Sequence, residues 1–166
     1  MAVKMFVDEI TIDQTGNAPV VVLKDENGKR KLPIWIGILE ASAIAAALEK
    51  QQFARPMTHD LFSNTLHELG IMLEKIVVSD LLDNTYYARL HLMDRNGKRF
   101  EIDARPSDSI ALAVRMEADI YVEEGVLSQA RSLDEKAETE LKKLDEEKLK
   151  EILENLDEDD LGKYRM

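Results

Sequence analysis

The sequence predicts an α+β fold, in which a duplicated β-β-β-α-α unit shares one mixed, barrel-like sheet and an acidic amphipathic helix follows. Three observations indicate this fold. A hairpin-turn motif, NGKR, occurs at residues 27–30 and returns at 96–99, 69 residues later. In both copies the apolar spacing then changes from every second residue to about every fourth. Residues 133–166 differ from the rest, being rich in Glu, Lys and Leu.

The first half of the chain predicts three strands and two helices. Strands are expected at 3–12, 20–23 and 32–36, and the Asn27-Gly28 turn between the last two supplies the positive φ angles of a tight hairpin. Apolar residues at helical spacing predict a helix over 40–52. A second helix is expected over 59–69, with Thr58 as its N-cap and Gly70 as its end.

The second half repeats this order. Strands are expected at 76–82, 86–93 and 100–104, and a helix that begins at Pro106 follows. A short strand at 120–122 and a short helix near 125–130 complete the domain. We therefore expect a domain over 1–132, with internal repeats at about 3–69 and 70–130. Segments 20–48 and 86–116 should superpose as like units.

The remaining segment, 133–166, is expected to form an acidic helical tail. Its apolar residues follow the i, i+3, i+4, i+7 spacing of an amphipathic helix, at Leu149, Ile152, Leu153 and Leu156.

Composition limits the location of the protein. The 166 residues include no cysteine and no apolar run of about 18 residues, and the first residues lack a signal-peptide core. These features predict a cytoplasmic protein that does not interact with membranes.

The net charge of −11 limits the choice of partners. Residues 1–132 hold 20 acids and 15 bases, and residues 133–166 hold 13 acids and 7 bases. Sequence-independent binding to nucleic acid depends on clustered Lys and Arg, so the charge argues against a protein that coats DNA. It argues less against a hydrolase, because such sites often gather carboxylates around a metal ion.

The candidate catalytic residues are Glu40, His59, Asp60 and Asp108. Glu40 and Asp108 occupy equivalent first-turn positions in the two repeats, and a pseudo-two-fold axis would relate them. Carboxylates with one imidazole suit Mg²⁺ or Mn²⁺, for which Glu40, Asp103 and Asp108 are the expected ligands. Such a metal ion would polarise a phosphodiester and lower the pKa of a bound water.

Two arginines are candidate substrate-binding residues. Arg55 and Arg105 each precede a proline at a helix entrance, from which a guanidinium can hold a phosphate. A purely structural interpretation stays open for the acids, because first-turn acids stabilise a helix by about 0.3–1 kcal/mol through its dipole. His59 and Asp60 are likewise compatible with a simple capped helix start.

Four motifs together resemble the bifunctional nuclease domain family. They are LPIWIG at 32–37, RPMTHDL at 55–61, DNTYYA at 83–88 and IDARPSDSIALA at 102–113. The resemblance covers about residues 3–130. It implies a compact α+β domain with a duplicated unit that self-associates as a homodimer or higher homo-oligomer. It also implies nuclease activity on DNA and RNA, and it carries over no established catalytic set.

Two functions therefore stay open. The first is a nuclease, acting with or without the assistance of a divalent metal, that takes nucleic acid as its substrate. The second is a non-catalytic dimeric protein-interaction or regulatory module, which the negative charge and the appended helix favour. Geometry distinguishes them: the enzyme is favoured if Glu40, His59, Asp60, Asp103 and Asp108 converge in one cleft, and the module if they are scattered.

Overall fold

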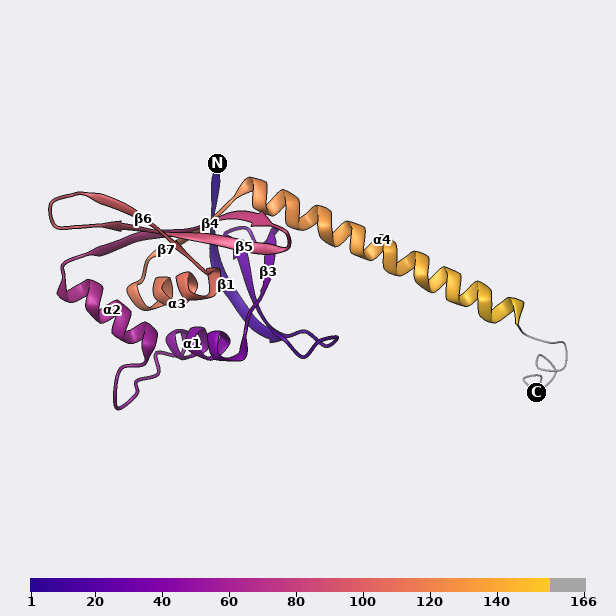
Figure 1. Cartoon of the computed structure of the whole chain (residues 1–166), viewed down its shortest axis with the longest axis horizontal. Helices are drawn as coiled ribbons and strands as arrows, with labels where there is room; N and C mark the ends of the chain where they lie inside the picture. The colour runs from indigo at the N-terminus through magenta and orange to yellow at the C-terminus, as the bar shows by residue number, and fades with distance from the viewer. Residues whose placement is uncertain (156–166) are drawn as a thin grey trace. The chain divides into compact units, whose positions relative to one another are not determined.

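The computed structural model describes residues 1–155, which form an α+β fold of seven strands and four helices (Figure 1). The strands are β1 (Ala2–Ile12), β2 (Pro19–Asp25), β3 (Lys31–Trp35), β4 (Met72–Leu82), β5 (Thr85–Met93), β6 (Arg99–Ala104) and β7 (Asp119–Glu123). The helices are α1 (Ile38–Leu48), α2 (Thr58–Glu68), α3 (Pro106–Met116) and α4 (Glu124–Glu154). None of these helices is both long and apolar enough to cross a bilayer.

All seven strands belong to one sheet, in the order β3-β2-β1-β7-β4-β5-β6. Strands β4 and β7 run parallel and every other pair is antiparallel, so the expected mixed sheet is confirmed. The expected barrel-like closure is wrong, because no ladder joins β3 to β6 within residues 1–155. Helix α3 packs on β4, β5 and β7, and α1 packs on β2 and α3. The sheet is therefore open, and these helices bury its apolar face.

The hairpin-then-helix order occurs twice, as β2-β3-α1 and as β5-β6-α3. Both hairpins turn at a glycine with positive φ, +66° at Gly28 and +81° at Gly97. In both, an aspartate at the start of the turn accepts backbone N–H bonds, Asp25 from Lys29 and Asp94 from Lys98. The order of elements is thus the expected one in both halves, and the origin of the halves in one duplicated unit stays a prediction.

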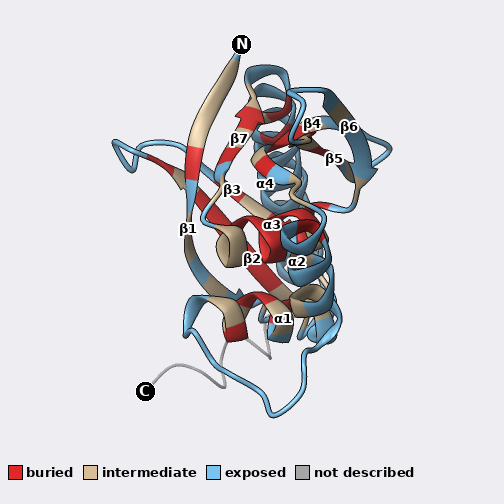
Figure 2. Cartoon of the chain, turned by 90° about the vertical axis from the view of Figure 1, so that its left-hand side faces the viewer, coloured by how far each residue is buried: buried red, intermediate tan, exposed pale blue. Residues whose placement is uncertain are grey.

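Helix α3 lies in the core of the domain. Seven of its eleven residues are buried, which appears in Figure 2 as the red ribbon of α3. Ile110 of α3 and Ile44 of α1 are fully buried, as are Leu23 of β2 and Ile76 of β4. Side chains in a close-packed core have little freedom to move. The first turn of α3, which carries the site described below, is therefore firmly placed.

Helix α4 is longer than expected. The chain divides into two compact units, Met1–Ser128 and Gln129–Met166, and α4 begins in the first and continues into the second as far as Glu154. The short helix expected near 125–130 and the helix expected in the tail are therefore one helix, and the boundary expected after residue 132 falls inside it. Leu149, Ile152 and Leu153 of the apolar stripe are exposed. Leu156 lies outside the described residues.

Candidate functional site

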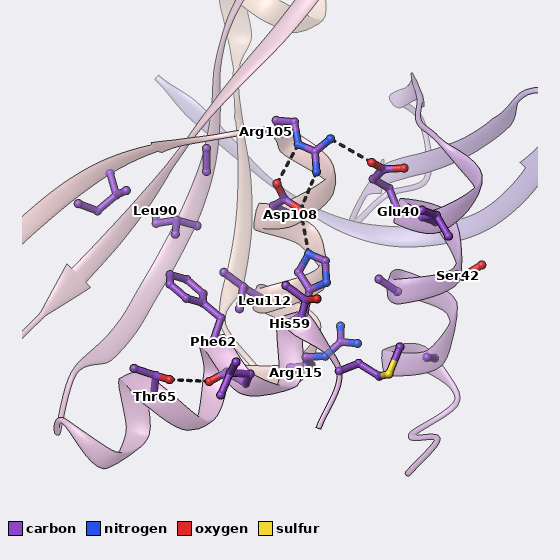
Figure 3. Close-up of a pocket in the computed structure, with 18 of the residues that line it drawn as sticks. Glu40, Ser42, His59, Phe62, Thr65, Leu90, Arg105, Asp108, Leu112 and Arg115 are labelled. Carbon is purple, nitrogen blue, oxygen red and sulfur yellow. Dashed lines mark hydrogen bonds and ion pairs between the residues drawn. The ribbon is translucent and has the colours of Figure 1, made fainter. Parts of the chain in front are cut away.

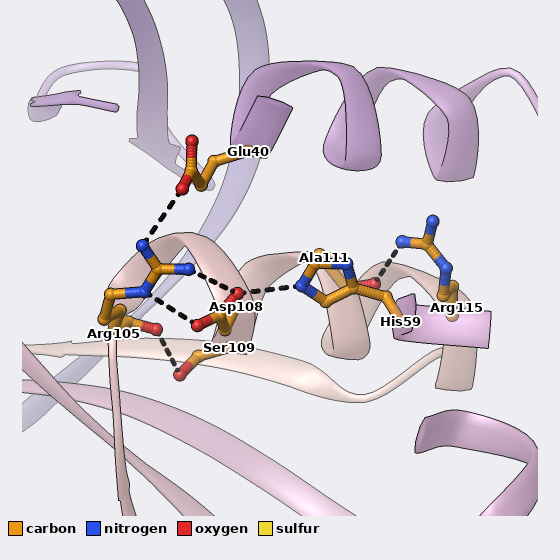
Figure 4. A network of polar contacts seen from close by, with 7 residues as sticks. All are labelled: Glu40, His59, Arg105, Asp108, Ser109, Ala111 and Arg115. Carbon is orange, nitrogen blue, oxygen red and sulfur yellow. Dashed lines mark hydrogen bonds and ion pairs between the residues drawn. The ribbon is translucent and has the colours of Figure 1, made fainter. Parts of the chain in front are cut away.

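Four side chains from three helix starts form one connected polar cluster (Figure 4). Nε2 of His59 lies 2.8 Å from Oδ1 of Asp108. The guanidinium of Arg105 donates to both carboxylate oxygens of Asp108, at 2.9 Å from Nε and 3.1 Å from Nη2. Its Nη1 donates to Oε1 of Glu40 at 3.0 Å. This cluster brings together four of the residues that the sequence singled out.

Helix starts place these side chains. Arg105 is the N-cap of α3, Pro106 is its first residue, and Asp108 and Glu40 lie in the first turns of α3 and α1. Proline suits the first helical position, because its missing N–H has no partner there in any helix. Acids in a first turn also face the positive end of the helix dipole. Glu40 and Asp108 therefore stabilise the starts of their helices and also belong to the polar cluster.

The start of α2 differs by one residue from the expected one. Helix α2 begins at Thr58 with Met57 as its N-cap, so the expected capping role of Thr58 is wrong. The Asp60 carboxylate accepts the Met57 backbone N–H at 3.1 Å, which caps the helix from inside its first turn. His59 is thereby held in the first turn, where its ring reaches Asp108.

The cluster favours ionised carboxylates. Partial burial opposes the charge on Asp108, but the hydrogen bonds from Arg105 and His59 outweigh it and hold the pKa of its carboxyl below the ordinary value. A hydrogen bond from its own backbone N–H, and then one from Arg105, lower the pKa of Glu40. Both acids raise the pKa of the Arg105 guanidinium. The three groups are therefore charged at neutral pH.

The cluster lies at one end of a cavity of about 920 Å³ (Figure 3). The cavity is lined by α1, the loop before α2, α2, one face of α3 and strands β5 and β6, and it is open to solvent. Most of its wall away from the cluster is apolar and includes Phe53, Met57, Phe62, Leu90 and Leu112. An apolar cavity with a few convergent polar groups is the usual form of a ligand or active site.

Asp60 does not join this cluster. Its Oδ1 accepts a 2.8 Å hydrogen bond from Nε of Arg115, whose side chain is only 9% exposed. Arg115 also donates from Nη1 to the Ala111 carbonyl at 2.9 Å. The hydrogen bond from Arg115 is the main reason that the pKa of Asp60 is lowered. Asp60 thus ties α2 to α3, next to the residue that contacts Asp108.

The other two candidate residues, Asp103 and Arg55, make no side-chain hydrogen bond or ion pair within residues 1–155. Asp103, near the end of β6, lines the cavity, but its carboxylate makes no hydrogen bond or ion pair within residues 1–155. Arg55 lies exposed in the loop before α2, outside the cavity wall, and its guanidinium likewise bonds to no described residue. Its expected contact with phosphate stays a prediction.

The residues present do not fit the expected divalent metal. Among the described residues, no group of three or more His, Asp or Glu side chains is arranged to hold an ion. The guanidinium of Arg105 occupies the space between Glu40 and Asp108 and bonds to both. A hard cation such as Mg²⁺ requires that space for itself and its waters. The groups that remain for chemistry here are therefore the imidazole, the two carboxylates and the guanidinium.

Two features of the site escaped the sequence analysis. Arg115 faces inward among apolar residues of α3, seven positions after Asp108, and a lone basic residue on an otherwise apolar stripe was the available signal. The apolar cavity wall had no such signal. Phe53 lies in a loop and Phe62 in a helix. The spacing of apolar residues in a sequence does not distinguish a cavity wall from a packed core.

Comparison with known proteins assigns the chain to a family. Residues 21–135 match the family described as the bifunctional nuclease domain. The chain therefore belongs to the bifunctional nuclease domain family. It is 44% identical over 156 residues to an uncharacterized protein of Mycobacterium tuberculosis, which covers 91% of this chain and 93% of that protein.

Plant relatives carry the nuclease name. The chain is 30% identical over 118 residues to bifunctional nuclease 2 of Arabidopsis thaliana, covering 66% of this chain and 36% of the plant protein. It is 26% identical over 114 residues to bifunctional nuclease 2 of Oryza sativa subsp. japonica, covering 67% and 35%.

Proposed function

We propose that the chain is a nuclease that hydrolyses phosphodiester bonds of DNA, RNA or both at the polar end of the cavity. The observation that carries the proposal is the His59–Asp108 pair in a member of this family. Nε2 of His59 is bonded to Asp108, and Nδ1 makes no hydrogen bond within the described residues. The ring lines the cavity, so a substrate there meets an imidazole with one nitrogen free.

The charge on Asp108 determines which nitrogen carries the proton. An ionised carboxylate only accepts hydrogen bonds, so a neutral His59 must carry its hydrogen on Nε2. Its Nδ1 then has a free lone pair and serves as a general base. It takes a proton from a water molecule as that water attacks phosphorus, the ester P–O bond breaks, and the leaving alkoxide takes a proton from solvent. Asp108 orients the ring and stabilises the imidazolium, as a carboxylate does beside a catalytic histidine.

Arg105 is the proposed phosphate-binding residue. Its side chain is 64% exposed while its guanidinium borders the cavity. The Nη1 that bonds to Glu40 can exchange this partner for a phosphate oxygen, while Nε and Nη2 keep Asp108 in place. A guanidinium binds phosphate through paired N–H bonds, which stabilises the charge that develops on the oxygens.

The proposal is tested by cleavage of single-stranded DNA, double-stranded DNA and RNA by identically purified wild type, His59→Ala and His67→Ala. Loss of a general base lowers a rate by about 10²–10⁴-fold, so we expect His59→Ala to lose that much activity. His67 is an exposed residue of α2 outside the cavity wall, and its removal should change nothing. Equal activity in all three proteins would refute the proposal and indicate a contaminating nuclease.

A second candidate function is an interaction module that self-associates as a homodimer or higher homo-oligomer. The observation in its favour is the row of exposed leucines and isoleucine on α4, including Leu141, Leu149, Ile152 and Leu153. Sedimentation of the full chain and of a chain ending at residue 132, over a range of concentrations, tests it. A concentration-dependent dimer that requires α4, in a protein without His59-dependent cleavage, would favour the module.

A further inference from the structure

We propose that the apolar part of the cavity holds one unpaired nucleobase of the substrate, so that the protein cleaves single-stranded or locally unpaired nucleic acid. This inference rests on the proposed function. It assigns a ligand to the part of the cavity that the His59–Asp108 chemistry does not use.

The geometry places a nucleoside in the apolar part. A scissile phosphate within reach of His59 and Arg105 lies at the polar end, and the nucleoside attached to it must continue from there. Phe62, Leu90 and Leu112 line the same cavity as His59, and Phe62 and Leu90 lie on the same side of the His59 ring (Figure 3). Phe62 is 41% exposed although it belongs to the cavity wall, so its ring is available for contact.

The chemistry of a base fits this wall. A nucleobase is neutral and flat, with apolar faces that stack on aromatic side chains whatever its sequence identity. A base inside a duplex is stacked and paired, and it reaches a cavity only by leaving the stack, at a cost of a few kcal/mol. Unpaired bases avoid that cost. The cavity therefore favours single strands, loops and frayed ends over an intact duplex.

Charge makes such a contact necessary. Most nucleic-acid binding proteins gain affinity from Lys and Arg on successive phosphates, but this chain has a net charge of −11. At the cavity, Arg115 is already paired with Asp60, and Arg105 is the arginine of the wall with a largely exposed side chain. One phosphate contact gives little affinity and a weak dependence on salt. The remaining affinity has to come from contact with the base.

The test measures KM and kcat on a short single-stranded DNA, with wild type, Phe62→Ala and Phe6→Ala. Base–aromatic stacking corresponds to roughly 5- to 150-fold in affinity, so Phe62→Ala should raise KM by about that factor and leave kcat within a few-fold. Phe6, on β1 and outside this cavity, is 43% exposed and serves as the matched control. Its removal should change neither constant.

Three further measurements complete the test. An oligonucleotide with one abasic site next to the single cleavable bond should show the same rise in KM with wild type, and no further rise with Phe62→Ala. A hairpin should be cut in its loop at least tenfold faster than in its stem. Raising the salt from 50 to 200 mM should change KM by less than about tenfold, as one phosphate contact requires.

The outcomes separate this inference from the proposed function. His59-dependent cleavage that is equally fast in stem and loop, or that is unaffected by both Phe62→Ala and the abasic site, would overturn the base-binding assignment and leave the nuclease standing. Cleavage that does not depend on His59 would remove the nuclease itself, and the inference with it.

Discussion

At the scale of single residues, Asp108 and Asp60 hold α2 against α3 from two sides. His59 and Asp60 are neighbours in the first turn of α2 and bond in turn to Asp108 and Arg115, which are seven positions apart on α3. The position of the His59 ring therefore depends on both contacts. The catalytic role expected for Asp60 stays a prediction, and from its bonds to Met57 and Arg115 we infer that Asp60 positions His59.

This explanation predicts the effect of Asp60→Asn on stability. The pKa of Asp60 lies below the ordinary value of 3.8 in the folded protein, so its ion pair stabilises the fold at pH above about 4, and this stabilisation is lost as the pH falls through the folded pKa. At pH 7 the variant should be less stable by about 1–3 kcal/mol, because the Arg115 side chain, which is only 9% exposed, loses its charged partner. Near pH 3 the difference should shrink.

Urea unfolding at the two pH values measures this difference. Asp80→Asn, at an exposed position on β4 without a side-chain partner among the described residues, is the control and should match wild type at both. An Asp60→Asn protein as stable as wild type at pH 7 would show that the ion pair does not hold α2 in place.

At the scale of secondary-structure elements, hydrophobic spacing and turn residues predicted most of the domain. The two Asn-Gly turns, the apolar alternation and the proline before α3 each correspond to a local physical preference, and such preferences can be read from one sequence. Two errors had a common cause. The closure of the sheet and the continuity of α4 depend on what packs against what, and local spacing does not contain that information.

Removal of the exposed part of helix α4 should leave the rest of the chain folded. Every described side chain from Arg131 to Asn155 is exposed, so a chain that ends at Ser132 loses little buried surface. We expect it to fold, with a melting temperature within about 5 °C of the full chain, as circular dichroism would show. A fall of 15 °C or more would mean that the helix is covered in solution, by the domain or by a second copy, and that the exposed leucines are part of a core.

At the scale of the whole molecule, the site could be predicted only in part. Glu40, His59 and Asp108 are far apart in the sequence, and the matching first-turn positions of Glu40 and Asp108 in the two halves were the signal that grouped those two acids. The arrangement within the group was not predictable. That Arg105 lies between the two acids and bonds to both depends on side-chain packing in three dimensions.

Nδ1 of His59, with Asp108 behind its ring, is the base that we propose for phosphodiester hydrolysis. The most direct measurement is single-turnover cleavage in excess EDTA by wild type and His59→Ala, with and without added imidazole. We predict that wild type stays active in EDTA, that His59→Ala loses about 10²–10⁴-fold, and that imidazole restores part of the variant's rate and leaves wild type unchanged. Wild-type cleavage that stops in EDTA and returns with Mg²⁺, or a variant as fast as wild type, would contradict it.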